Sequence, residues 1–115
     1  METTPRFLNG VYAFDGAGLD APAPLHAGLS YTVPGDKRAQ LIYARLGNSS
    51  PEMVYLSLMH DGKPIRLFPI GAKAGSHVPL AVVEDLSPDS RIELFLAAPA
   101  DCSGTVVVDV GLVEI

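Results

Sequence analysis

The stretch MVYLSLMHDGKPIRLFPI, residues 53–70, decides the fold class of this chain. It consists of two apolar runs, 53–59 and 65–70, on either side of the polar tetrapeptide HDGK at 60–63. Asp-Gly in a two-residue turn supplies the positive φ angles that a type I′ β-hairpin requires. The stretch therefore predicts two antiparallel strands joined by a tight turn.

Prolines predict which strands lie at the edges of the sheets. Pro64 and Pro69 fall in the second arm of the hairpin, and Pro79 falls in the apolar run 78–83. Proline has no N–H to give to a neighbouring strand, so inside a sheet it is confined to edges and bulges. We expect both of these strands to be edge strands or to be interrupted.

Apolar runs like those of the hairpin recur along the whole chain, separated by turns rich in Gly, Pro, Asn and Asp. Short strands at spacings of about 8–12 residues are typical of sandwiches and barrels. No other window has apolar residues at helical spacing without proline, so we expect almost no helix. The sequence predicts one all-β domain over residues 1–115, an antiparallel β-sandwich of about seven or eight strands. The expected strands are residues 7–14, 29–33, 39–46, 53–59, 65–70, 78–83, 91–98 and 105–115, and residues 15–24 are expected to cross the domain as a long loop.

The segment VEDLSPDSRIEL, residues 83–94, resembles the connection between sheets in fibronectin type III-like domains, where a leucine and a proline turn precede a strand. Ile92 stands near the place where such domains usually have a tyrosine, and the chain has no tryptophan. Jelly rolls of seven or eight strands use similar turns. The resemblance implies a sandwich and leaves jelly-roll and fibronectin III/Ig-like topologies open.

Composition narrows the range of partners. The net charge is −5, and the eight Lys and Arg residues are scattered among thirteen Asp and Glu, with only Lys37 and Arg38 adjacent. Nucleic acids and anionic membrane surfaces are bound by clustered cations, so neither is expected as a partner. No apolar stretch reaches membrane-spanning or signal-peptide length. With Cys102 as the only cysteine, the sequence favours a cytoplasmic protein, although a processed or virion-borne protein would share these features.

The residue types of enzyme sites are present only singly. His26, His60 and His77 form no close pair of the kind that announces a zinc site, which leaves open whether they converge in space. Cys102 follows an acid, which would raise its pKa and not activate it, and the chain lacks nucleophile-elbow and P-loop patterns. We therefore expect no catalytic residues, no metal and no cofactor. The triplet 48–50, Asn-Ser-Ser, matches a glycosylation acceptor but is more simply a turn.

One set of residues favours a different function, the binding of a carbohydrate or another small ligand. Each of two tyrosines has a polar residue two positions further on, hence on the same face of its strand. If the strands are adjacent, aromatic rings and polar groups would form one platform. The candidate ligand-binding residues are Tyr43, Arg45, Tyr55, Arg66 and His60.

Several strands are apolar on both faces, notably within residues 39–46, 94–98 and 106–113. An antiparallel sheet with one wet face should alternate apolar and polar residues, and large exposed apolar patches mark interaction surfaces. We therefore predict a non-enzymatic structural or interaction protein: a subunit of a homo-oligomer, for which a jelly-roll trimer is one solution, or an accessory subunit of an obligate protein partner.

Overall fold

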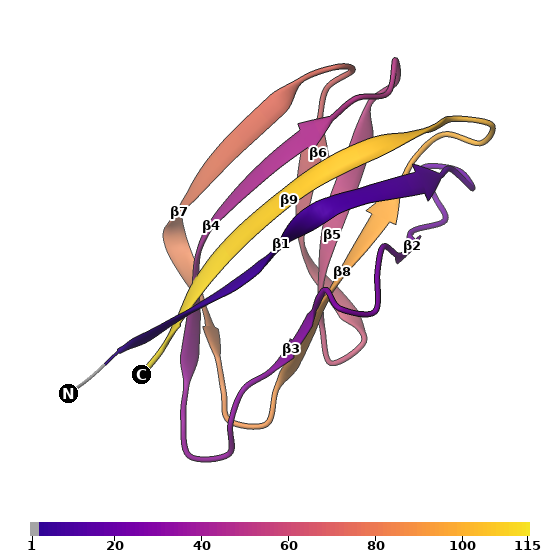
Figure 1. Cartoon of the computed structure of the whole chain (residues 1–115). Coiled ribbons are helices and arrows are strands. Elements are labelled where there is room, and N and C mark those ends of the chain that lie inside the picture. The colour runs from indigo at the N-terminus through magenta and orange to yellow at the C-terminus, as the bar shows by residue number, and fades with distance from the viewer. Residues whose placement is uncertain (1–2) are drawn as a thin grey trace.

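The computed structural model describes the backbone of residues 3–115 and the side chains of that range except residues 81–83. Within it the chain forms nine strands and no helix (Figure 1). The strands are β1 (Thr4–Asp15), β2 (Ala23–Pro24), β3 (Ser30–Thr32), β4 (Ala39–Asn48), β5 (Val54–His60), β6 (Lys63–Ile70), β7 (Gly75–Leu86), β8 (Arg91–Ala97) and β9 (Ser103–Glu114).

Two antiparallel sheets pack face to face, which confirms the predicted sandwich. The first sheet has the order β1-β9-β4-β7, and the second has the order β2-β8-β5-β6, with the short β3 also pairing with β8 (Figure 1). In the described part of the chain only β5 and β6 are neighbours both in sequence and in a sheet. The connection from β2 to β3 stays in the second sheet, and the others pass from one sheet to the other. This is the strand order of a jelly roll, with the first strand beside the last, and not the ABED and CFG sheets of the Ig fold.

The β5–β6 hairpin forms as its sequence predicts. His60 pairs with Lys63 across the turn, and both turn residues have positive φ, 48° at Asp61 and 84° at Gly62, as a type I′ turn requires. The strands with internal prolines, β6 and β7, are each at the edge of a sheet, as expected.

The core lies between the sheets and is filled by the inward-facing residues of both. Many of its side chains are large and almost completely inaccessible, and burial of each contributes about 1.5–3 kcal/mol. Among the largest fully buried side chains are Leu29, Leu41, Leu56, Leu58, Ile70, Leu86, Ile92, Leu94, Leu112, Val33, Val54 and Val106.

Several features depart from the expected strands. The strand expected over residues 78–83 is longer and runs over Gly75–Leu86 as β7. Ala23 and Pro24, predicted as loop, pair with Leu96 and Phe95 as the short strand β2, while residues 16–22 cross between the sheets as predicted. In β4 the pairing register shifts between Leu41 and Tyr43. This bulge turns Ile42 outward and keeps Leu41 and Ala44 both buried, so part of the two-sided apolar character of residues 39–46 is resolved inside the domain.

Asn48, the last residue of β4, stabilises the turn that follows this strand. Its side chain is only 5% exposed. Nδ2 donates hydrogen bonds to the carbonyl oxygens of Glu52 (2.8 Å) and Gly71 (3.1 Å), and Oδ1 accepts one from the Ser50 N–H. The nitrogen that a glycan would need is therefore buried and bonded within the turn.

Candidate functional site

The outer face of the first sheet holds the strongest candidate site. Strand alternation places the inner residues of β1 and β9 in the core and turns the others to the surface. In register across the sheet, Phe7 pairs with Gly111, Asn9 with Asp109 and Val11 with Val107. The same β9 residues pair on their other side with Tyr43, Arg45 and Gly47 of β4.

Three large apolar side chains are exposed on this face. Phe7, Val11 and Val107 have exposed fractions of 55, 66 and 49%. Val11 and Val107 are direct cross-strand partners. Phe7 lies on the same face of β1, four residues before Val11. We call these three residues the β1–β9 apolar patch.

Next to this patch the side chains are polar and contact one another. The Tyr43 hydroxyl donates to Asp109 Oδ1 at 3.2 Å. The Arg45 guanidinium lies 5.3 Å from the Tyr43 ring centre, within cation–π range. His77 meets the same ring edge-on, with the centroids 6.2 Å apart. Partial burial, and secondarily the charge of Asp109, raise the pKa of Tyr43.

A shallow depression lies between these polar side chains and Val107. Gly47 of β4 pairs with Gly75 of β7, and because neither has a side chain, the sheet backbone itself forms the floor. The space above it is about 540 Å³. Its walls are Arg45, His77, Asp109 and Val107.

The outer face of the second sheet carries a second groove, of about 440 Å³, whose lining includes Tyr55, Ile65 and Leu67. The Tyr55 hydroxyl donates to the carbonyl oxygen of Leu19 at 2.6 Å, so the loop between β1 and β2 reaches over this face. Leu67 is 61% exposed. The sandwich therefore has apolar surface on both of its outer faces.

The predicted ligand platform does not form as one surface. It required the strands of Tyr43 and Tyr55 to be adjacent, but β4 lies in the first sheet and β5 in the second. Tyr43 and Arg45 are brought together on one outer face, and Tyr55 lies on the opposite one. The connection from β4 to β5 changes sheet, and this topology cannot be deduced from local sequence.

Arg66 and His60 are also separated from that platform. Arg66 lies on the inward side of β6 with Phe68 and Ile70, and its guanidinium forms an ion pair with Glu84 of β7, which links the two sheets. His60 closes β5 opposite Ile92, half-buried, with Nε2 3.7 Å from Asp61 Oδ2.

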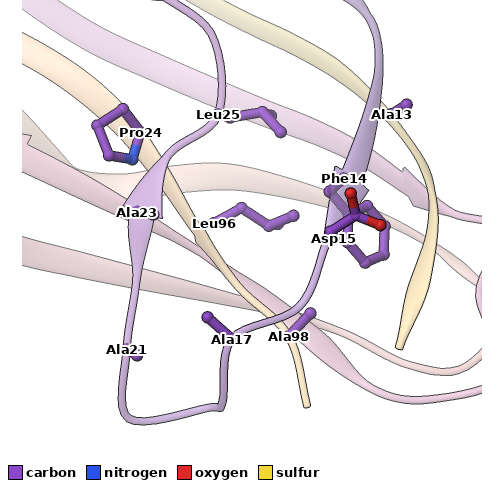
Figure 2. Close-up of a pocket in the computed structure, with 10 residues that line it drawn as sticks. All are labelled: Ala13, Phe14, Asp15, Ala17, Ala21, Ala23, Pro24, Leu25, Leu96 and Ala98. Atoms are coloured by element: carbon purple, nitrogen blue, oxygen red, sulfur yellow. The ribbon is translucent and has the colours of Figure 1, made fainter. Parts of the chain in front are cut away.

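A more enclosed pocket of about 180 Å³ lies beneath the loop that joins β1 to β2 (Figure 2). Ala17 and Ala21 of the loop, Leu25 and Leu96 surround it (Figure 2). Asp15 is the only titratable group among the described residues that line it. A single carboxylate among alanines supplies neither a nucleophile with its base nor a set of metal ligands.

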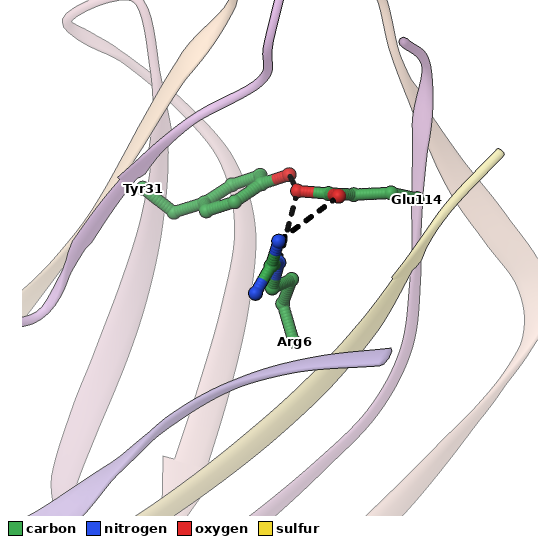
Figure 3. Close-up of polar contacts among 3 residues, drawn as sticks. All are labelled: Arg6, Tyr31 and Glu114. Carbon is green, nitrogen blue, oxygen red and sulfur yellow. Dashed lines mark hydrogen bonds and ion pairs between the residues drawn. The ribbon is translucent and has the colours of Figure 1, made fainter. Parts of the chain in front are cut away.

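The tightest polar cluster lies between the sheets (Figure 3). Glu114 of β9 is 4% exposed and accepts hydrogen bonds from the Tyr31 hydroxyl and from Arg6 Nε, the latter at 3.1 Å. These two hydrogen bonds hold the pKa of Glu114 below its usual range. Burial, and then the hydrogen bond to Glu114, raise the pKa of Tyr31. Since its groups satisfy one another, the cluster acts as a clamp between β3 and the β1–β9 pair.

The histidines and the cysteine stay apart. Among the residues with described side chains, no three His, Cys, Asp or Glu come close enough to hold a metal ion. His26 stacks on Tyr12 with ring centroids 4.8 Å apart, whereas His77 is on the far side of the first sheet. Cys102 is a half-buried free thiol.

Sequence reasoning did not single out Phe7, Val11 or Leu67. The stretch FLNGVYAF, residues 7–14, is apolar at both even and odd positions, and this was the available signal. Which set of positions would face outward depends on the partner strand β9, which is far away in sequence.

Comparisons with known proteins bear on the fold. No family model and no curated protein matches the sequence. The chain is similar to a chain in the structure of infectious bursal disease virus Gt strain, with 11% identity and a TM-score of 0.51 over 98% of this chain and 33% of that one. A chain from the Gx strain of the same virus matches at 15% identity and a TM-score of 0.46, over 98% and 36%. The chain thus spans about a third of these viral chains, and the first likeness supports the β-sandwich. No helix in the described part of the chain could cross a membrane.

Proposed function

We propose that this chain is a non-enzymatic structural subunit that acts by associating with other protein chains, as part of a homo-oligomer or a larger assembly. The observation that carries the proposal is the β1–β9 apolar patch, three large apolar side chains at 49–66% exposure on one sheet face. Large apolar side chains gathered on one exposed sheet face favour an interaction site, and here the row of Asn9 and Asp109 lies between Phe7 and the Val11–Val107 pair.

The energetics support association through this face. Burial of apolar surface contributes roughly 25 cal/mol per Å², and a standard interface buries about 800 Å² on each partner. The polar cluster beside the patch supplies the rim that such interfaces require, since Tyr43, Arg45 and Asp109 can bond to a partner at its border. Jelly rolls occur both in viral capsid domains and in lectin domains, so the fold accommodates an assembly subunit.

The mass of the purified protein in solution tests the proposal. We expect sedimentation velocity to show a species larger than the monomer at micromolar concentration. Val107→Lys should dissociate it, because a charge would enter the apolar patch. Ala72→Lys, in the exposed turn between β6 and β7 at the opposite edge of the first sheet, is the matched control and should leave the mass unchanged. A strict monomer that also co-purifies with no other chain would contradict the proposal.

A second candidate function is the binding of a carbohydrate or another small polar ligand in the depression over Gly47 and Gly75. The observation in its favour is the mutual arrangement of Tyr43, Arg45 and Asp109 at its border, an aromatic ring with a cation and an anion in contact. Aromatic faces with adjacent polar groups suit sugar rings.

Thermal-shift screening against a panel of mono- and oligosaccharides tests this second function. A sugar that binds should raise the melting temperature of the wild type and leave that of Arg45→Ala unaffected. Arg91→Ala, which removes an exposed arginine from the second sheet, is the control that should keep the response. No shift with any sugar would refute the carbohydrate form of this function without affecting the assembly proposal.

A further inference from the structure

The edges of the two sheets differ in how well they are protected. Exposed edge strands invite pairing with other chains, and proteins block them with prolines, bulges or very short strands. At the edges of the second sheet, β6 carries Pro64 and Pro69, and β2 and β3 have two and three residues. In the first sheet, β7 carries Pro79 and a register shift opposite β4.

The remaining edge strand, β1, lacks this protection. It has twelve residues, and its only proline, Pro5, is next to its start. It pairs with β9 in continuous register from Thr4 to Asp15. The side chains that flank the open edge on the outer face are uncharged: Pro5, Phe7, Asn9, Val11 and Ala13.

The backbone groups of β1 show which residues are available for pairing. One pair beyond the β1–β9 register, the Gly16 N–H donates to the Cys102 carbonyl oxygen at 2.6 Å. In an antiparallel ladder alternate residues point both their N–H and C=O to the same side. The even-numbered residues of β1 therefore bond to β9, and the odd-numbered residues direct their backbone groups to the open edge.

We propose that β1 pairs antiparallel with β1 of a second copy of this chain, around a two-fold axis at Asn9, so that two first sheets join into one continuous eight-stranded sheet. This inference rests on the proposed function and names its partner and contact surface. An isologous contact of this kind closes as a dimer.

The register follows from the positions of the apolar side chains. A two-fold axis at Asn9 places Phe7 of each copy opposite Val11 of the other, on the same outer face. In the dimer, Phe7 of each copy is thus covered by Val11 of the other, so this apolar contact forms twice. An axis at Gly10 would instead place Phe7 opposite Ala13, and an axis at Val11 would place it opposite Asp15. Neither register covers Phe7 with a large apolar side chain.

The inner side of the edge is compatible with this pairing. Tyr12 stacks on His26 there, with ring centroids 4.8 Å apart. Its hydroxyl donates to the Asn9 carbonyl oxygen at 3.2 Å, and a carbonyl oxygen has a second lone pair for the N–H of the other copy. No like charges meet along the outer face.

Disulfide trapping tests the pairing and its register. In a Cys102→Ser background, Asn9→Cys places two thiols opposite each other at the axis, where the Cα–Cα distance of about 5.5 Å suits a disulfide. We expect most of this variant to run as a covalent dimer on non-reducing gels after mild oxidation. Ala13→Cys is the control. In this register the cysteines of the two chains lie about eight residues apart along the strands, roughly 27 Å, so they should not cross-link.

The outcomes separate this inference from the proposed function. Cross-linking at Asn9→Cys and not at Ala13→Cys supports the pairing, and equal or absent cross-linking at both overturns it. A trimer, or an oligomer in which Asn9→Cys stays uncross-linked, overturns β1 pairing and leaves the proposed function standing. A strict monomer without a co-purifying chain overturns both.

A second variant tests the same edge without cysteines. Val11→Lys places a charge opposite Phe7 of the other copy twice in each dimer, so the dimer dissociation constant should rise at least about tenfold. Val11 is 66% exposed in the single chain, so this substitution should leave folding intact, which a far-UV spectrum and a thermal melt would verify. An unchanged dissociation constant would overturn the pairing.

Discussion

Asn48 shows how much one buried polar residue holds in this fold. Its amide group bonds three separate backbone positions around the turns that follow β4 and β6. Asn48→Asp would remove both Nδ2 donors and set a carboxylate against two carbonyl oxygens. Each carbonyl keeps another donor, Ser50 Oγ for Glu52 and the Ala74 N–H for Gly71, so the cost comes from the lost amide donors and from a buried carboxylate that faces two acceptors. We expect the free energy of unfolding to fall by about 1–3 kcal/mol, measured by urea denaturation.

The neighbouring hydroxyl provides the comparison for this change. Ser49 is exposed, and its Oγ accepts one hydrogen bond from the Thr105 N–H at 2.9 Å. Ser49→Ala should cost less than about 1 kcal/mol. If the two variants lost the same stability, the buried network of Asn48 would not have the role assigned to it.

Glu114 is the residue that should make stability depend on pH. Its pKa is lowered in the folded protein by hydrogen bonds from Tyr31 and Arg6. A carboxylate with a lowered folded pKa stabilises the fold above its unfolded pKa, near 4.3, and this stabilisation disappears as the pH falls through the folded pKa. We expect denaturation midpoints to decline below about pH 4 in the wild type and to decline less in Glu114→Gln.

Tyr31→Phe provides the control for this pH dependence. It removes the largest cause of the lowered pKa and keeps the ring, so protonation of Glu114 should begin at higher pH. The decline in stability should accordingly start at higher pH than in the wild type. Identical pH profiles for all three proteins would assign the acid sensitivity to other carboxylates.

At the scale of elements, the β5–β6 hairpin depends on its turn. Gly62 has φ of +84°, and a Cβ added there would meet no atom within 4 Å. The cost of Gly62→Ala is therefore one of backbone conformation alone, about 1–2 kcal/mol for an L-residue in the left-handed region. Urea denaturation should show this loss. Gly71→Ala, where φ is not positive and the new Cβ would be 3.6 Å from Ala74 Cβ, should lose less, and the reverse order would refute the argument.

At the scale of the whole molecule, association and stability should be coupled. If two copies join along β1, only the folded chains bind, and mass action stabilises the folded state. The melting temperature of the wild type should then rise as protein concentration increases from about 1 to 100 μM, while that of Val11→Lys should stay nearly constant. A wild-type melting temperature independent of concentration would argue against a reversible dimer.

The sequence by itself determined the class of the fold and several of its local details. Recurrent apolar runs separated by turn residues predicted the sandwich. Asp61-Gly62 predicted the type I′ turn, and the prolines of β6 and β7 predicted the edge positions. Each of these signals depends on the conformation of a few residues adjacent in the chain, so it can be read from local sequence. The turn role of Asn48 followed in the same way, because its bonds are mostly to residues near it in the chain.

The tertiary structure alone decided which residues share a surface. Whether Tyr43 and Tyr55 lie together depends on which sheet each strand joins, and the connections of a jelly roll cross from sheet to sheet over long separations. The bulge between Leu41 and Tyr43 shifted the buried positions of β4 from odd to even residue numbers. The open edge of β1 and the outward Phe7 and Val11 likewise exist only because β9, the last strand, pairs on the other side. Non-local strand pairing has no signature in local sequence, so the candidate interaction surface became visible only in the folded molecule.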